Sequence, residues 1–388
     1  MAHDFNTPIE RLDTDCVKWS VYERDVIPMW VADMDFSAPA PVLDALHKRI
    51  DHGVFGYQID CPSLREVLVD RLQTRHGIQA TSEELLFTPG IVSALNIVCR
   101  TFGEPGDGVL VNTPIYPPFL SAPKVGDKVL QIAPLAETRD GSCLHYEIDF
   151  DALEAAVTPR TKIFLFCNPH NPVGRVYTRV ELERIADFVL RHDLILCSDE
   201  IHCDLLHPGS QHVSIASLSQ EIAERTITLS APSKTFNIPG LGLGFAVIEN
   251  PEFMQKMRSA IYENAAFVNT LAYTAAEAAY RDGQAWLDAL LVYLTENRDL
   301  MVDFMHEHLP QIPLTKPEGT YLAWLDCRAL NTDESPYQFF LNHARIAFND
   351  GEAFGEDGKG FVRLNYGCTR STLVDALERM REAVNRLS

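Results

Sequence analysis

Short strands that alternate with helical segments constrain the fold of this chain more than any other feature. Six runs of apolar and β-branched residues have the length and composition of strands: 85–88, 108–112, 162–166, 194–198, 226–230 and 244–248. Helical periodicity lies between them, as over 179–191, where Thr178 and Glu181 form a capping box. This alternation predicts an α/β fold, with a mostly parallel sheet covered by helices on both faces.

The pattern changes after residue 250, where helices dominate. A long helical pattern covers 286–308, and the run 320–326 alternates as a half-exposed strand does. With 388 residues, the chain is long enough for two domains. We expect three parts: an N-terminal arm over 1–45, a large domain over 46–284, and a smaller α+β domain over 285–388 on which the arm packs.

The composition excludes several classes of protein and partner. The formal net charge of −21 argues against nucleic acid or an anionic membrane as a partner. The chain starts without a secretory signal and has no apolar run long enough to cross a bilayer. Its nine cysteines include no C-x-x-C pair, so neither a metal site nor a disulfide framework is indicated. We expect a cytoplasmic protein with reduced cysteines and small-molecule partners.

Lys234 lies in a stretch of small and apolar residues over 229–244. Burial disfavours the ammonium form, so a lysine with dry neighbours should have a lowered pKa. A neutral amine can form a Schiff base with a carbonyl, the chemistry that pyridoxal phosphate (PLP) requires. Most lysines lie on surface loops, so Lys234 by itself does not establish a PLP site.

Two further motifs follow predicted strands. Asn171 belongs to N-P-H-N-P-V-G, and Asp199 belongs to S-D-E-I-H. Because ligands collect at the carboxyl ends of parallel strands, we expect Asn171, Asp199 and Lys234 to share one crevice. In this order and at these separations, the three motifs resemble the fold-type I PLP enzymes of the aminotransferase superfamily.

PLP needs a Schiff-base lysine, an acid near its pyridine nitrogen, a stacking face, a phosphate cup and an anchor for the substrate carboxylate. Lys234 fits the first role and Asp199 the second. Asn171 could bond the phenolic oxygen of the ring, besides holding its proline-flanked turn. Tyr116 is the stacking candidate, for which a packed loop position is an equally good interpretation.

The phosphate candidates lie at a helix start. Gly90 precedes the helix predicted over 91–102, where the N–H groups of Ile91 and Val92 would favour an anion. An ordinary helix start after a turn is the alternative. The hydroxyls of Ser230 and Ser233 are further candidates for binding the phosphate.

Two further side chains have two interpretations each. His202 either faces the oxygen side of the ring or packs in the interior. Arg363 lies on the alternating strand 361–365, where spacing alone favours an outward-facing charge. Facing inward, it would be a bidentate clamp for a carboxylate.

From about Phe5 to Leu387, the chain resembles the MalY/PatB branch, the cystathionine β-lyases or cysteine C–S lyases. Six segments carry this resemblance: 28–36 (PMWVADMDF), 52–57 (HGVFGY), 198–202 (SDEIH), 233–239 (SKTFNIP), 319–326 (GTYLAWLD) and 360–368 (GFVRLNYGC). It implies α,β-elimination of L-cystathionine or related L-cysteine S-conjugates to a thiol, pyruvate and ammonia.

The resemblance also implies residue roles. It implies a homodimer in which Tyr57 reaches the phosphate of the neighbouring subunit, and it makes Arg363 the carboxylate anchor. Asn171 and Tyr57 would lie near the substrate. Asp33, with Trp30 and Tyr116, would border the pocket that selects the thiol.

Three alternatives remain. An aminotransferase would share every site residue, although Gly242 stands where many aminotransferases have an arginine that contacts phosphate. A nicotinamide-dependent oxidoreductase would use the glycines of 240–244, but these lead into a strand-like run rather than a helix. No sequence feature favours or disfavours an additional regulatory role.

Overall fold

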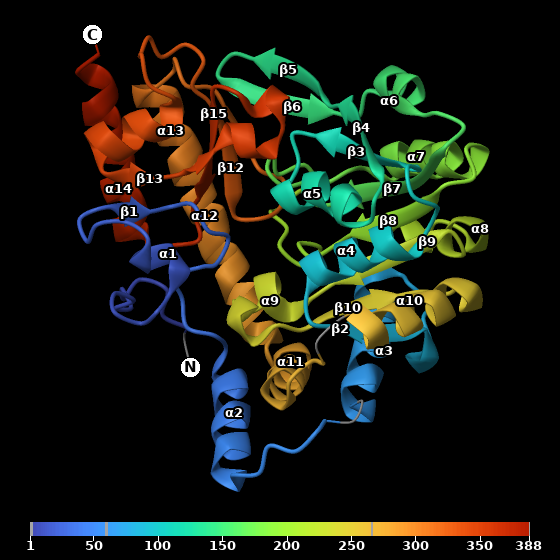
Figure 1. The fold of residues 1–388 in the computed structure, drawn as a ribbon. Helices are drawn as coiled ribbons and strands as arrows, with labels where there is room; N and C mark the ends of the chain where they lie inside the picture. The colour runs from blue at the N-terminus through green and yellow to red at the C-terminus, as the bar shows by residue number, and fades with distance from the viewer. Residues whose placement is uncertain (1–2, 59–60, 265–266, 388) are drawn as a thin grey trace.

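The large sheet carries the fold of this protein. A computed structural model describes residues 3–58, 61–264 and 267–387 (Figure 1). In spatial order the large sheet consists of β2 (Leu85–Thr88), β10 (Gly244–Val247), β9 (Thr226–Ser230), β8 (Ile195–Asp199), β7 (Thr161–Cys167), β3 (Gly108–Thr113) and β4 (Val129–Pro134). β9, β8, β7, β3 and β4 are parallel, whereas β10 is antiparallel to both neighbours. The expected mostly parallel α/β sheet is therefore confirmed.

Both faces of the inner strands are buried, which explains why these strands are continuous apolar runs, whereas the edge strand β4 is largely exposed. Along β7, Ile163 and Leu165 pack on one side and Phe164 and Phe166 on the other. The first side is covered by α4 (Ile91–Thr101), α5 (Pro117–Val125) and α10 (Pro251–Asn264). The second is covered by α6 (Phe150–Ala156), α7 (Arg179–Arg191) and α8 (Gln220–Ala223). α7 begins with the expected capping box of Thr178 and Glu181.

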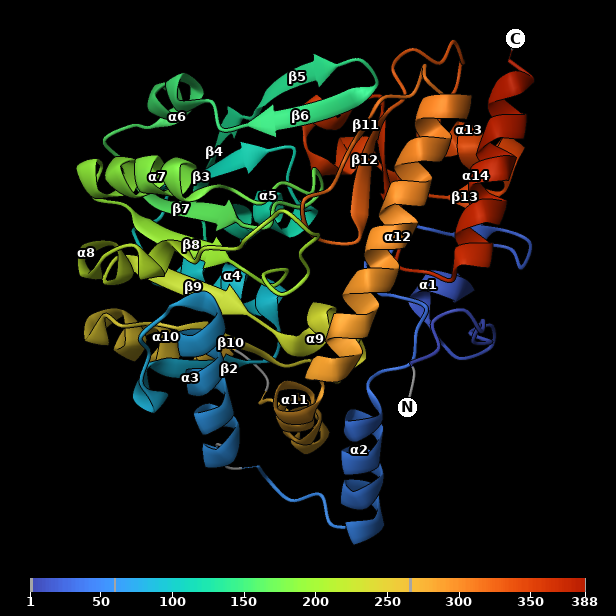
Figure 2. The ribbon, with the colours of Figure 1, turned by 180° about the vertical axis from the view of Figure 1, so that it is seen from behind.

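A second sheet joins distant parts of the chain. Its order is β14 (Asn349–Asp350), β15 (Phe361–Asn365), β12 (Leu322–Asp326), β11 (Leu314–Thr315), β6 (Cys143–Glu147) and β5 (Ala136–Asp140). The hairpin β5–β6 comes from the middle of the sequence and pairs with β11. Figure 2 shows the long helix α12 (Gln284–His308) beside this sheet, with α13 (Pro336–Phe339) and α14 (Arg370–Asn385) beyond it.

The expectation of a half-exposed strand over 320–326 is wrong, because β12 is buried along its whole length. Leu322 and Leu325 belong to the core cluster that includes α12 and α14. Trp324 packs in another cluster and stacks on Phe361, with ring centroids 5.2 Å apart. Both faces of β12 are therefore covered by packed side chains, and neither face is left to solvent.

The N-terminal segment packs against the C-terminal part of the chain. It contains α1 (Val17–Ser20) and β1 (Ile27–Pro28), which pairs in parallel with β13 (Ile346–Ala347). Both Figure 1 and Figure 2 show this segment near α14. The expected domain boundaries stay a prediction.

Three helices flank the β2 end of the large sheet: α2 (Ala40–His52), α3 (Pro62–His76) and α11 (Thr270–Asp282). α2 packs on α11 and projects at the lower end of the molecule (Figure 1). Among the helices of the described residues, none is both long and apolar enough to cross a membrane. The nine cysteines are free thiols.

Candidate active site

The carboxyl ends of β7, β8 and β9 lie level with one another. Cys167 pairs with Asp199, which in turn pairs with Leu229. Beyond these ends lies a cavity of about 240 Å³. The structure places nine of the candidate residues on its wall: Gly90, Ile91, Val92, Tyr116, Asn171, Asp199, His202, Ser233 and Lys234.

Lys234 faces this cavity from the single-turn helix α9 (Pro232–Thr235). Its Nζ donates a hydrogen bond of 2.6 Å to the Ala32 carbonyl. Burial, together with the positive charge of Arg363, lowers the pKa of the amine from 10.5 to about 8. Neutral amine is therefore present near neutral pH, which a nucleophile or a base requires.

Asp199 ends β8 and is buried. Its Oδ1 accepts a hydrogen bond of 3.0 Å from the Ile201 N–H. Burial, with a smaller contribution from Glu200, raises the pKa of this carboxyl to about 7. A cationic N–H group in the cavity would favour the ionised form, because an opposite charge offsets the cost of burial.

Arg363 points inward from β15 with only 3% of its surface exposed, so the outward-facing interpretation is wrong. β15 lies between β12 and β14 and is buried along its whole length. The Nη1 of Arg363 donates to Asn171 Oδ1 at 2.9 Å, and Nη2 donates to the Trp30 carbonyl at 2.9 Å. Within the described residues its Nε has no partner, and burial lowers the pKa of the guanidinium to about 10. Nη2 also donates to Asn349 Oδ1, so the Nε–H and the second proton of Nη1 are the donors left for an anion.

Tyr116 and His202 add two rings to the site. Tyr116 immediately precedes α5, and its N–H donates to the Asn171 carbonyl at 3.2 Å. His202 is buried and lies edge-on to Tyr321, with centroids 6.1 Å apart. Burial and the charge of Lys234 lower the pKa of His202 to about 3, so its imidazole is neutral.

The N-terminus of α4 opens into the same cavity. Gly90 precedes the helix with φ 147° and ψ 165°, a conformation that side-chain-bearing residues rarely adopt. The first N–H groups of a helix lack intrahelical acceptors, so this end favours an anion. Ser233 stands on the cavity wall as a further donor.

Four of the candidates do not line this cavity, and one of them, Arg363, approaches it through Asn171. Ser230 faces away from it: its Oγ lies 4.0 Å from Cys203 Sγ, at a second cavity. Thr228 lines that second cavity as well, because alternate residues of β9 share a face. The other two are Tyr57 and Asp33.

Tyr57 is fully exposed and Asp33 forms an ion pair with Arg11. The Asp33 carboxylate nevertheless raises the pKa of Lys234, against the effect of burial. Asp33 Oδ1 is buried without a partner among the described residues.

Ala32 and Tyr321 were not expected at the site. The Tyr321 hydroxyl donates a hydrogen bond of 2.8 Å to the Ala32 carbonyl, the same acceptor that Lys234 uses. Tyr321 lies in the segment 319–326 that carries the family resemblance, but its spacing contains no signal for a contact with a residue 289 positions earlier.

Comparisons with known proteins place this geometry among related enzymes. Residues 24–380 match the family described as aminotransferase class I and II. Cystathionine β-lyase PatB of Bacillus subtilis (strain 168) is 38% identical over 390 residues, covering 98% of this chain and 100% of PatB.

Two solved structures are similar over nearly the whole chain. OvoB is 42% identical with a TM-score of 0.92, covering 98% of this chain and 99% of OvoB. Cystalysin from Treponema denticola, which contains PLP, is 36% identical with a TM-score of 0.95 and covers both chains fully (100%).

Proposed function

The chain belongs to the aminotransferase class I and II family, and on that premise we propose that it is a PLP-dependent carbon–sulfur β-lyase. It would eliminate the β-substituent of L-cystathionine or a related L-cysteine S-conjugate, releasing a thiol, pyruvate and ammonia. The observation that carries the proposal is one cavity that combines the Lys234 amine and the Asp199 carboxyl, with Arg363 behind Asn171. The names of PatB and cystalysin support the same activity and cofactor.

The residues around the cavity fit PLP. The low pKa of Lys234 suits a covalent link to an aldehyde, and the buried Asp199 suits a protonated pyridine nitrogen. The α4 N-terminus and Ser233 would hold the phosphate. Bound PLP supplies an electron sink for negative charge that develops at the substrate Cα.

Three further side chains would orient the ring. Tyr116 would stack on it, and Asn171 would donate to the phenolic oxygen through its amide nitrogen, since its Oδ1 already accepts from Arg363. Neutral His202 lines the cavity on the Asp199 side without adding positive charge. These roles remain proposals for each residue.

The protein groups would act on the substrate in two ways. Arg363 would bind the α-carboxylate, because a guanidinium offers paired donors to two oxygens. Once free, the Lys234 amine would remove the Cα proton as general base. A thiolate then leaves Cβ readily, because a thiol is acidic, with a pKa of about 8.5 for free cysteine.

The decisive experiment supplies L-cystathionine and other S-substituted cysteines without any keto acid. We expect pyruvate and free thiol to form in equal amounts. The matched control is Lys234→Ala, which should form neither product and bind no cofactor covalently, as judged by absorbance before and after borohydride.

Amino transfer to an added keto acid, with no thiol released, would replace the lyase by an aminotransferase. The structure offers one observation on this alternative. Gly242, at the position of the phosphate-binding arginine of many aminotransferases, lies on the cavity wall without a charge.

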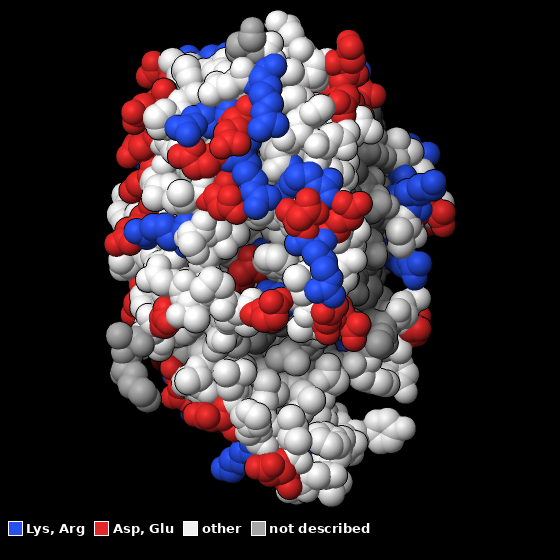
Figure 3. Space-filling view, turned by 90° about the vertical axis from the view of Figure 1, so that its left-hand side faces the viewer, with Lys and Arg blue, Asp and Glu red and all other residues white. Residues whose placement is uncertain are grey.

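A homodimer with shared active sites is part of the proposal. Large apolar side chains are exposed on α2, on the chain that follows it, on α10 and between α10 and α11: Leu43, Ile50, Val54, Phe55, Tyr57, Tyr262 and Phe267. Figure 3 shows that the lower end of one face, where α2 projects, is mostly uncharged. Exposed apolar surface of this kind is typical of subunit contacts.

Mixed dimers test this assembly. If Tyr57 completes the site of the neighbouring subunit, mixing inactive Lys234→Ala and Tyr57→Phe chains should restore activity in one of the two sites of the mixed dimer. Full activity of a monomeric form would contradict it. A cytoplasmic location, expected from the free cysteines, stays a prediction.

A further inference from the structure

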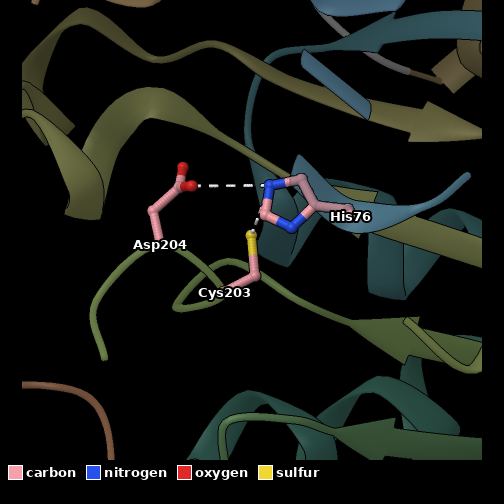
Figure 4. Close-up of side chains that lie close together, drawn as sticks. All are labelled: His76, Cys203 and Asp204. Carbon is pink, nitrogen blue, oxygen red and sulfur yellow. Dashed lines mark hydrogen bonds and ion pairs between the residues drawn. The ribbon is translucent and has the colours of Figure 1, made fainter. Parts of the chain in front are cut away.

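A second cluster of polar side chains lies next to the turn that follows Asp199. His76 is the last residue of α3, while Cys203 and Asp204 lie in the turn after β8. Figure 4 shows the three side chains converging from these two elements. Their ligand atoms, an imidazole nitrogen, a thiol sulfur and a carboxylate oxygen, lie within 4.8 Å of one another.

Both contacts of His76 in the cluster are longer than an ordinary N–H···O hydrogen bond. His76 Nε2 lies 3.4 Å from Asp204 Oδ1, beyond the 2.7–3.2 Å of an N–H···O bond. The same nitrogen lies 3.8 Å from Cys203 Sγ, and one proton cannot point at both atoms. Bond lengths of about 2.0–2.1 Å to nitrogen and oxygen and about 2.3 Å to sulfur place tetrahedral ligands about 3.3 Å (N to O) and about 3.5 Å (N to S) apart. The two separations from His76 Nε2 are close to these values, and all three ligand atoms lie within 4.8 Å of one another.

A small cavity lies at the cluster. Its volume is about 10 Å³, and His76, Cys203 and Asp204 all line it. A space of this size holds about one water molecule or one ion. Ser230 lines it too, which explains why this serine is not at the first cavity.

The charges around the cavity suit a divalent cation. Arg71 Nη2 lies 2.7 Å from Asp204 Oδ1 and would orient this carboxylate from outside. Glu200 also lines the cavity and is held by His212 at 2.9 Å. Asp204, Glu200 and a Cys203 thiolate would carry three negative charges. These balance the single positive charge of Arg71 plus the two positive charges of a divalent ion.

We propose that His76, Cys203 and Asp204 bind a divalent metal ion of the zinc type, with a water molecule as fourth ligand. One nitrogen, one thiolate and one carboxylate are ligands that Zn²⁺ accepts, whereas Mg²⁺ and Ca²⁺ prefer oxygen alone. The ion would tie α3 to the turn that begins at Asp199. Its role is structural, and it holds the loop with Asp199 and His202 in place.

The test measures metal on the purified holoenzyme with added Zn²⁺, after dialysis against a weak chelator. We expect about one zinc per chain by elemental analysis, and X-ray absorption at the zinc edge should show one sulfur ligand. Cys203→Ser and His76→Leu should each lower zinc affinity at least tenfold. Cys327→Ser is the matched control, since Cys327 is equally buried but lies outside the cluster, and it should keep the metal.

Stability is the second measurement. A strong chelator should lower the unfolding temperature of the wild type and of Cys327→Ser, and leave that of Cys203→Ser unchanged. A wild type that takes up well below one zinc per chain would overturn the proposal. Zinc without a sulfur ligand, or equal zinc in Cys203→Ser, would overturn it as well.

Discussion

Replacing Lys234 by methionine should stabilise the cofactor-free protein while abolishing activity. The lysine amine is held in a desolvated site, where burial lowers its pKa from 10.5 to about 8. Methionine has a similar length and no charge. The Ala32 carbonyl keeps a donor in the variant, because the Tyr321 hydroxyl still bonds it at 2.8 Å. No buried acceptor is left unsatisfied.

The magnitude follows from the pKa. At about 1.4 kcal/mol for each pKa unit, the lowering from 10.5 to about 8 means that the charged amine costs the folded state about 3 kcal/mol near pH 7. The variant loses one hydrogen bond to Ala32, worth about 0.5–1.5 kcal/mol. The net gain in the free energy of unfolding is therefore about 2 kcal/mol.

The same two pKa values determine how the stability difference between the wild type and the variant changes with pH. Between pH 8 and pH 10.5 the unfolded chain keeps a proton on this amine that the folded chain has released. Wild-type stability therefore rises with pH in this window relative to the variant, because the unfolded state binds more protons. The advantage of methionine should be complete below pH 8 and fall below about 1 kcal/mol by pH 9.5.

Urea unfolding of both cofactor-free proteins at pH 7.0 and pH 9.5, at equal protein concentration, measures this difference. Lys316→Met is the matched control, since the Lys316 side chain is 54% exposed and should change stability by less than about 0.5 kcal/mol. A Lys234→Met protein that is less stable than the wild type at pH 7.0, or an advantage that does not shrink with pH, would refute the reasoning.

Three further substitutions test local features. Thr178→Ala removes the capping box of α7 and should lower the free energy of unfolding by about 1 kcal/mol in urea titrations. Gly90→Ala places a side chain at φ 147°, so we expect the free energy of unfolding to fall by about 1–3 kcal/mol and the affinity for inorganic phosphate to fall as well. Unchanged stability would contradict this expectation. Arg363→Lys replaces paired donors by a single ammonium, so KM for the S-conjugate should rise about 10–100-fold in steady-state kinetics; an unchanged KM would exclude Arg363 as the anchor.

Local and periodic information was sufficient for several elements and for the part of the site that follows parallel strands. The helix over 179–191 and the strand over 361–365 have the expected bounds, because capping residues and apolar spacing act within a few residues of each other. The gathering of Asn171, Asp199 and Lys234 at one cavity follows from strand order alone, since parallel strands end at the same edge.

Contacts between distant segments needed the tertiary structure. Whether Arg363 faces inward depends on β12 and β14 on either side of its strand, and the side to which Ser230 points depends on the register of β9. The Ala32 carbonyl meets Lys234 only because the N-terminal segment packs back onto the site. His76 meets Cys203 127 residues further along the chain. Periodicity reports which residues avoid water, whereas packing of whole elements decides which buried groups meet.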